Sequence, residues 1–145
     1  MLIVEIKKEQ KRSSSIVIYF SDDDKVLLLK RKKDNSSVID YAGKWGLVGG
    51  KSEEDETPKE AAIRETNEES GLKVLPEDLI MIATIKSPQG YPVYVFACKK
   101  FQGTVNAQSV AEEHDDYRWV SIDKVDKYDT PENTMSLIKK AISMV

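Results

Sequence analysis

One acid-rich stretch, from Gly50 to Leu72, limits what this chain can fold into more than any other part of its sequence. It reads GKSEEDETPKEAAIRETNEESGL and carries signals for both ends of a helix. Thr57 can cap the helix, Pro58 suits the first helical position, and Glu60 stands where a capping box needs an acid. Gly71 supplies the stop. The stretch therefore predicts one helix between Thr57 and Gly71.

This expected helix has two different faces. At about 100° per residue, Glu65, Glu68 and Glu69 share one arc of the helix surface. A neighbouring face is small or apolar enough to lie on a sheet and consists of Ala62, Ile63 and Thr66. Carboxylates this close repel each other, so a folded protein keeps them ionised only with a cation among them. Oxygen ligands suit a hard ion, and the spacing therefore predicts a site for Mg²⁺ or Mn²⁺.

The residues before the helix suit the same kind of site. The segment Gly46-Leu47-Val48-Gly49-Gly50 can bring backbone close to an ion or a phosphate, and Glu56 stands just ahead of the helix. A solvated charged helix, held by pairs such as Arg64 with Glu68, would also explain the charges. It would explain neither the glycines nor the spacing, so we favour the metal site.

The spacing resembles the signature of the Nudix hydrolases, G-x5-E-x7-R-E-U-x-E-E-x-G-U, in which U is an apolar residue. The matching positions are Gly50, Glu56, Arg64, Glu65, Glu68, Glu69, Gly71 and Leu72. The preceding GKWGLVGG also resembles the lead-in of that family. Three positions depart, since Thr66 replaces an apolar residue, Val48 a frequent proline and Asp55 a frequent glycine. None of these changes removes a carboxylate, and we expect activity to survive them.

The resemblance implies hydrolysis of a nucleoside diphosphate linked to another group, with Mg²⁺ as cofactor and Mn²⁺ as a substitute. The catalytic residues it implies are Glu56, Arg64, Glu65, Glu68 and Glu113. The metal ligands it implies are the Gly49 carbonyl, Glu65, Glu68, Glu69 and Glu113, and the substrate-binding residues are Arg31 and Gly50. Within this set, we expect Arg64 to pair with a carboxylate of the helix and Glu56 to orient Arg64.

The general base stays open between several glutamates. In the family, a glutamate ahead of a strand with a tryptophan often completes the metal site or acts as the base. Glu112 and Glu113 both qualify, as does a glutamate of the helix, and Glu113 is preferred because it stands six residues before Trp119. His114 is the only histidine, and in so charged a loop we expect it to be solvated.

Several other conspicuous side chains are expected to pack rather than react. Trp45 is interpreted as a core or rim anchor in preference to a base-stacking ring, and Tyr91 and Tyr94 as sheet packing. Cys98 lies in an apolar run and is given no role. The basic run from Lys30 to Lys33 is typical of a solvated strand end, and only the resemblance suggests that Arg31 reaches substrate phosphates.

Length, charge and composition indicate the number of domains, the expected partners and the expected location of the protein. The length of 145 residues predicts a single domain over residues 1–145. A net charge of -3 lacks the basic excess of a duplex-binding module, so nucleic acid is an unexpected partner. The single cysteine excludes a disulfide within the chain, and neither a signal peptide nor a bilayer-spanning segment is visible. We expect a cytoplasmic protein without membrane contact, either a monomer or a homodimer.

The order of apolar runs predicts an α+β fold. The expected strands are Leu2–Ile6, Ile16–Phe20, Val26–Leu29, Leu72–Val74, Leu79–Ile85 and Tyr91–Cys98, with the second and third forming a hairpin and the last two another. Residues 7–15 and 34–40 read as polar connections. A last helix starts near Pro131 and places Met135, Ile138, Ile142 and Val145 on one face. This gives a mixed sheet between helices, in agreement with the α/β/α sandwich that the resemblance implies.

Three functions fit these expectations. The first is a pyrophosphohydrolase for nucleoside triphosphates, including deoxynucleotides, with a nucleotide-housecleaning role. The second is a hydrolase of ADP-ribose or dinucleoside polyphosphates, which is less favoured because a chain of this length has little room for the extra N-terminal domain with which many ADP-ribose hydrolases dimerise. The third is a catalytically silent nucleotide-sensing module, which would not need the whole carboxylate set.

Overall fold

Two β-sheets form the centre of the molecule. The computed structural model describes residues 12–33 and 42–145. One sheet is mixed and has the order β4-β1-β6-β5, with β1 at Ser14–Tyr19, β4 at Val48–Lys51, β5 at Ile80–Lys86 and β6 at Pro92–Cys98. The other is antiparallel and has the order β3-β2-β7, with β2 at Lys25–Arg31, β3 at Trp45–Gly46 and β7 at His114–Ser121. Within the mixed sheet, β1 pairs parallel with β6 and antiparallel with β4.

Strands β1 and β2 explain why there are two sheets. The polar turn between them closes as predicted, because the amide of Ser21 donates to the carbonyl of Lys25 at 2.8 Å. Beyond the turn, the two strands share only the bridge between Phe20 and Val26. Each strand then pairs with other partners, so the predicted hairpin exists only at its closed end.

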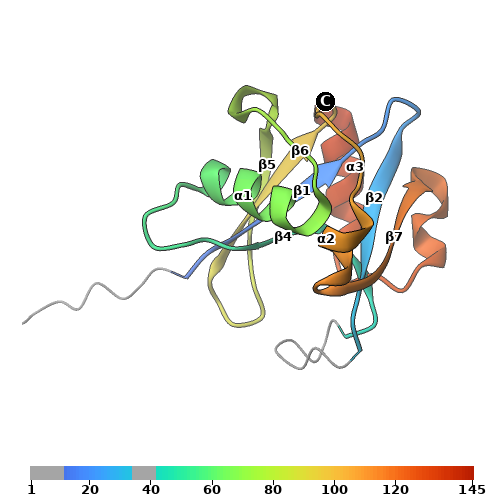
Figure 1. The fold of residues 1–145 in the computed structure, drawn as a ribbon, viewed down its shortest axis with the longest axis horizontal. Coiled ribbons are helices and arrows are strands. Elements are labelled where there is room, and N and C mark those ends of the chain that lie inside the picture. The colour runs from blue at the N-terminus through green and yellow to red at the C-terminus, as the bar shows by residue number, and fades with distance from the viewer. Residues whose placement is uncertain (1–11, 34–41) are drawn as a thin grey trace, which may run out of the picture.

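Helices cover both faces of the sheets (Figure 1). Successive side chains of a strand point to opposite faces, and β1 shows this clearly. Val17 and Tyr19 belong to the core beneath α1 (Pro58–Ser70) and α2 (Ala107–Ala111), whereas Ile18 and Phe20 belong to the core beneath α3 (Thr134–Met144). The predicted α/β/α sandwich is therefore confirmed. Figure 1 shows α1 and α2 in front of the strands and α3 behind them.

Most predicted elements are present, with several corrections. The expected strand Leu72–Val74 is wrong, since only Lys73 forms a bridge, to Gln102, while Leu72 and Val74 are buried in the core. Ser14 and Ser15, expected in a connection, begin β1. The expected strand Leu2–Ile6 and the expected loop 34–40 lie outside the described residues.

Short helical elements were the least predictable. Helix α2 was not expected; its cap is Asn106, whose side chain accepts from the amides of Gln108 and Ser109. Two 3-10 helices, η2 (Pro76–Asp78) and η3 (Ile122–Lys127), occupy segments expected to be turns or left unassigned.

The final helix begins later than its proline suggests. Helix α3 starts at Thr134, after Asn133 in a left-handed conformation. Ile138 faces the core as expected, but Val145 at the chain end is exposed. Trp45 is buried in the core beneath α3, at 5.3 Å from the ring of Tyr128, which agrees with its interpretation as an anchor. Within the described part of the chain, no helix combines the length and the apolar character that crossing a membrane requires.

Candidate functional site

Helix α1 is held at both ends in the predicted way. The Thr57 hydroxyl accepts from the Glu60 amide at 3.2 Å, and the Glu60 carboxylate accepts from the Thr57 amide at 3.1 Å. Gly71 adopts the left-handed conformation with φ 82° and its amide donates to the Asn67 carbonyl. The capping box and the glycine stop are confirmed, so the direction of every side chain on α1 follows from local sequence.

The two glycines before the helix are needed for space. A side chain at Gly49 would overlap the backbone of Ser15 and Ile16 in β1, and one at Gly50 would overlap the carboxylate of Glu65. Strand β4 thus carries its backbone directly against β1 on one side and against a carboxylate of α1 on the other. The approach of this backbone to an ion or a phosphate, which the sequence predicts, stays a prediction.

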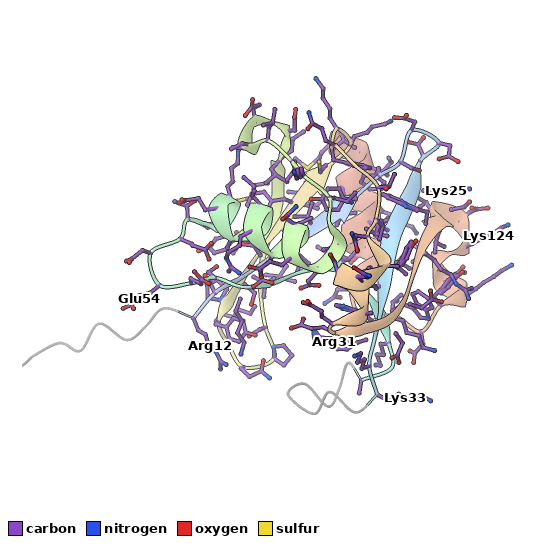
Figure 2. All side chains as sticks on the ribbon, viewed as in Figure 1. Arg12, Lys25, Arg31, Lys33, Glu54 and Lys124 are labelled. Carbon is purple, nitrogen blue, oxygen red and sulfur yellow. The ribbon has the colours of Figure 1, made fainter. Side chains whose placement is uncertain are left out.

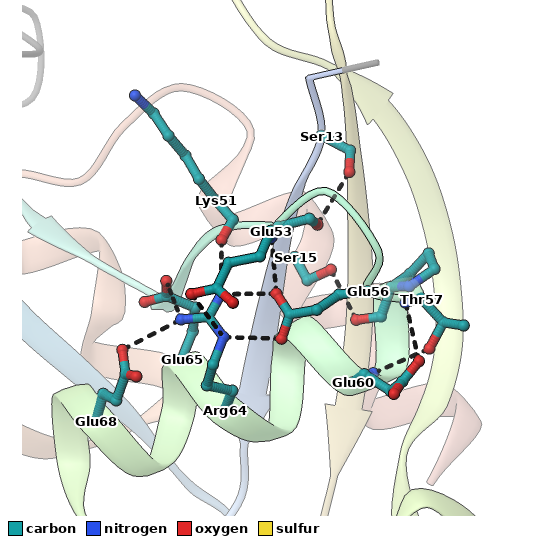
Figure 3. Close-up of polar contacts among 12 residues, drawn as sticks. Ser13, Ser15, Lys51, Glu53, Glu56, Thr57, Glu60, Arg64, Glu65 and Glu68 are labelled. Atoms are coloured by element: carbon teal, nitrogen blue, oxygen red, sulfur yellow. Dashed lines mark hydrogen bonds and ion pairs between the residues drawn. The ribbon is translucent and has the colours of Figure 1, made fainter. Parts of the chain in front are cut away.

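Arg64 holds the first group of carboxylates together (Figure 3). Its Nε and Nη2 donate to the two oxygens of Glu56, both at 2.8 Å. Its Nη1 donates to Glu65 at 2.9 Å and to Glu68 at 3.2 Å, while Nη2 also donates to the Lys51 carbonyl at 3.0 Å. The expected pairing of Arg64 with helix carboxylates is therefore present. The Lys51 carbonyl is a partner that the sequence did not reveal, because any residue type can supply it.

Glu56 accepts more hydrogen bonds than Glu65 or Glu68 in this group. The hydrogen bonds from Arg64, and secondarily the backbone amide of Glu53 at 2.7 Å, hold the pKa of the Glu56 carboxyl below its usual value although partial burial opposes them. Glu56 therefore stays ionised and holds Arg64 in place, which agrees with the part that the resemblance implies for it.

A second group of carboxylates lies deeper. Glu69 is only 7% exposed, and burial raises the pKa of its carboxyl well above the usual value, with the charges of Glu113 and Glu65 adding to the effect. Arg31 and the Gly49 backbone act in the opposite direction. Burial likewise raises the pKa of Glu65 against the opposing hydrogen bond from Arg64. These two carboxylates carry an electrostatic cost that the described residues do not fully offset.

The structure separates the two glutamates that the sequence left open. The charge of Glu113 acts on both Glu65 and Glu69. Glu112 instead presents its backbone carbonyl to the Nζ of Lys32, at 3.4 Å. Glu113 stands directly before the start of β7, and its charge reaches the carboxylates of α1.

His114 was expected to be solvated, and this is wrong. It is the first residue of β7, is 5% exposed, and places its Nε2 3.8 Å from a Glu69 carboxylate oxygen. Burial, with the nearby charge of Arg31, lowers the pKa of His114 to about 4, so the ring is neutral near pH 7. Asp115 and Asp116 are typical of a loop, and this composition hides the start of the strand. In the structure, β7 extends through both residues and begins with a buried position at His114.

Arg31 also reaches this region, from the end of β2 (Figure 2). It is paired in register with His114 at an irregularity between Lys30 and Arg31, and its charge is felt by Glu69. Among residues 12–33 and 42–145, no carboxylate lies within ion-pairing distance of its guanidinium. The structure thus brings together Arg31, Gly49, Gly50, Glu56, Arg64, Glu65, Glu68, Glu69 and Glu113, which are all the expected site residues.

The carboxylates suit a divalent cation, although they are not yet arranged around one. In the described part of the chain, no three acidic, histidine or cysteine side chains converge closely enough to hold an ion, and Arg64 occupies oxygens of Glu65 and Glu68. The donors are nevertheless all oxygens, and a cation among Glu65, Glu69 and Glu113 would offset the repulsion between them, which adds to the effect of burial on the pKa values of Glu65 and Glu69. The residues therefore fit Mg²⁺ or Mn²⁺.

Known proteins show the same sequence pattern and the same fold. The family model described as NUDIX domain matches residues 10–140. A nucleoside triphosphate pyrophosphatase/Nudix hydrolase fusion protein from Bifidobacterium longum (strain NCC 2705) is 35% identical over 85 residues, which are 57% of this chain but only 17% of that protein. The chain thus spans a small part of the length of this relative.

Solved structures extend the likeness over nearly the whole chain. The crystal structure of the MutT protein from Methanosarcina mazei Go1 is 28% identical, has a TM-score of 0.72, and covers 91% of this chain and 93% of its own. The NUDIX domain of Shewanella oneidensis NrtR, solved in complex with ADP ribose, is 20% identical with a TM-score of 0.67, over 91% of this chain and 86% of its own, and shares the fold. With the family model matching most of its length and the signature residues gathered at one site, this chain belongs to the NUDIX family.

Proposed function

We propose that the protein is a metal-dependent hydrolase of phosphoanhydride bonds in nucleoside diphosphate derivatives. The observation that carries this proposal is the group formed by Glu65, Glu68, Glu69 and Glu113 beside the side-chain-free backbone of Gly49 and Gly50. A binding module would not need four carboxylates whose mutual repulsion calls for a cation. An enzyme that must bind a metal next to a phosphate chain does need them.

Each residue has a defined part in this proposal. Mg²⁺ would be held by Glu65, Glu68, Glu69, Glu113 and the Gly49 carbonyl, and when bound it supplies neutralisation of phosphate oxygens and a water of lowered pKa. Arg64, oriented by Glu56, keeps the carboxylates of Glu65 and Glu68 at fixed positions.

Two residues complete the proposed machinery. Arg31 binds the anionic substrate as a cation without a carboxylate partner among the described residues. Glu113 serves as a ligand or takes the proton of the attacking water, since it shares the region of Glu65 and Glu69.

Within this class, we propose nucleoside triphosphates, including deoxynucleotides, as the substrates, with a nucleotide-housecleaning role. Support comes from the basic end of β2, where Arg31 lies beside the buried carboxylates and Lys32 extends to the Glu112 carbonyl. Figure 2 places Arg31 and Lys33 at the same end of that strand. A triphosphate carries more negative charge than the internal diphosphate of ADP-ribose and therefore gains more from several cations.

The test is a product analysis. The protein is incubated with Mg²⁺ and a panel of nucleoside triphosphates, ADP-ribose and dinucleoside polyphosphates, and the products are identified by mass. Pyrophosphate and a monophosphate from a triphosphate would support the proposal, whereas AMP from ADP-ribose would favour the second substrate class. Micromolar binding without any product would favour a sensing module. A reaction with EDTA in place of Mg²⁺ serves as the control and should yield no product.

A further inference from the structure

The only histidine of the chain is buried close to one proposed metal ligand. His114 is 5% exposed and Glu69 is 7% exposed, and the two come from β7 and α1, which are far apart in the sequence. The irregular pairing of β2 with β7 at Lys30 and Arg31 occurs just where His114 enters the strand. Buried polar side chains without a structural partner are uncommon, so this arrangement calls for an explanation.

The contact itself has a direction. Nε2 of His114 lies 3.8 Å from the Glu69 Oε2 atom, which is near but longer than a hydrogen bond, while Nδ1 is buried and has no hydrogen-bond partner among the described residues. A neutral imidazole has one N–H donor and one acceptor nitrogen. With the proton on Nδ1, an acceptor nitrogen would face the Glu69 carboxylate and the donor would be buried without a partner. With the proton on Nε2, the donor faces the carboxylate.

We propose that His114 is a positioning residue for Glu69, with its Nε2–H directed at the buried carboxylate to orient it toward the cation. This inference rests on the proposed role of Glu69 as a metal ligand. Groups that orient a ligand carboxylate from behind restrict its rotation, and their removal typically weakens metal binding by about 10- to 100-fold. His114 suits this role because Glu113, the residue directly before β7, acts with its charge on the same cluster.

The position of the ring proton provides the first test, and it requires neither metal nor turnover. Because the chain has one histidine, tag-free protein labelled with ¹⁵N-histidine gives one set of ring nitrogen resonances. We expect the protonated nitrogen to be Nε2, and its resonance to shift in Glu69→Gln. A proton on Nδ1, or ring resonances that do not change in Glu69→Gln, would overturn the inference independently of any catalytic activity.

Metal binding by three variants provides the second test. In His114→Gln the amide nitrogen can occupy the place of Nε2, whereas in His114→Asn it can occupy only that of Nδ1, and His114→Phe keeps the ring shape without a donor. Titration with Mn²⁺ in the absence of nucleotide should give a Kd within about 3-fold of wild type for Gln and raised by at least about 10-fold for Asn and Phe.

The controls separate this inference from the function on which it rests. Thermal unfolding of the metal-free variants shows whether each is folded at the assay temperature. Wild-type affinity in folded His114→Phe, or an equal loss in all three variants, would contradict positioning through Nε2. Absence of Mn²⁺ binding by the wild type would overturn the proposed metal-dependent function itself, while the ring-proton measurement would still decide whether His114 directs its donor at Glu69.

Discussion

The acidic side chains around α1 fall into two groups whose environments are opposite. Glu56 accepts two hydrogen bonds from Arg64, and these hold the pKa of its carboxyl below the usual value. Glu69 is buried among other carboxylates, and its pKa is raised. The carboxylates on α1 and just ahead of it thus include charges that an arginine of the protein stabilises and charges that are buried without full compensation. The first group stabilises the fold, and the second is suited to bind a metal.

The strongest test of this contrast is Glu69→Gln. Loss of a buried ligand charge should lower turnover with saturating Mg²⁺ by more than about 10²-fold. The same change should raise the melting temperature of the metal-free protein near neutral pH, because a carboxyl with a raised pKa costs stability once it ionises. Steady-state kinetics and calorimetry in EDTA measure the two effects. A variant that is both active and less stable would contradict the contrast.

Glu68→Gln tests the more exposed end of the cluster. The Glu68 side chain is 58% exposed and contacts Arg64 within the group, and an amide of the same size at this exposed position disturbs no buried packing. We expect turnover to fall by about 10²-fold with little change in the stability of the metal-free protein. Turnover equal to wild type at saturating Mg²⁺ would remove Glu68 from the set of ligands.

Arg64→Lys tests the hydrogen-bond network that Arg64 forms with Glu56 and its neighbours. Lysine keeps the charge but cannot make the paired contact with Glu56 while also reaching Glu65 and the Lys51 carbonyl. We expect a loss of about 1–2 kcal/mol in unfolding free energy and a fall in turnover of about 10-fold. Denaturant unfolding of the metal-free protein measures the unfolding free energy. If Arg64→Lys has the same unfolding free energy as wild type, the hydrogen-bond network contributes little to stability.

The smallest expected effect is a difference in acid stability. Because the pKa of Glu56 is lowered in the fold, its contribution is present above the unfolded-state value and is lost as pH falls through the folded value. Wild type should therefore lose stability between about pH 5 and pH 3 more steeply than Glu56→Gln, whose side chain does not titrate. Melting temperatures across this range provide the measurement, and parallel curves for the two proteins would count against the ionised Glu56–Arg64 pair.

The features that local spacing controls were predictable. The cap at Thr57, the stop at Gly71 and the common face of Glu65 and Glu68 depend on residues within one or two turns, and all are present. The pairing of Arg64 with carboxylates of its own helix follows from the same short spacing. The layer order was also accessible, since strand and helix periodicities assign each apolar residue to one face of the sheets.

The features that depend on long-range pairing were not predictable. The split of β1 and β2 into separate sheets depends on which distant strands each one meets, and one sequence without structure does not specify those partners. Which of Glu112 and Glu113 stands next to the first residue of β7 also depends on that strand's long-range pairing. The same strand start buries His114, although its place in a charged segment predicts a solvated side chain.

The sequence by itself therefore determined the chemistry available to this protein. It placed carboxylates on one helix face, backbone without side chains at Gly49 and Gly50, and an arginine within reach of glutamates of its own helix. The tertiary structure alone decided which of those carboxylates are stabilised and which are buried at a cost. Burial and long-range charge arise only when α1, β2 and β7 come together, so the opposite pKa shifts of Glu56 and Glu69 could not be assigned before the fold was known.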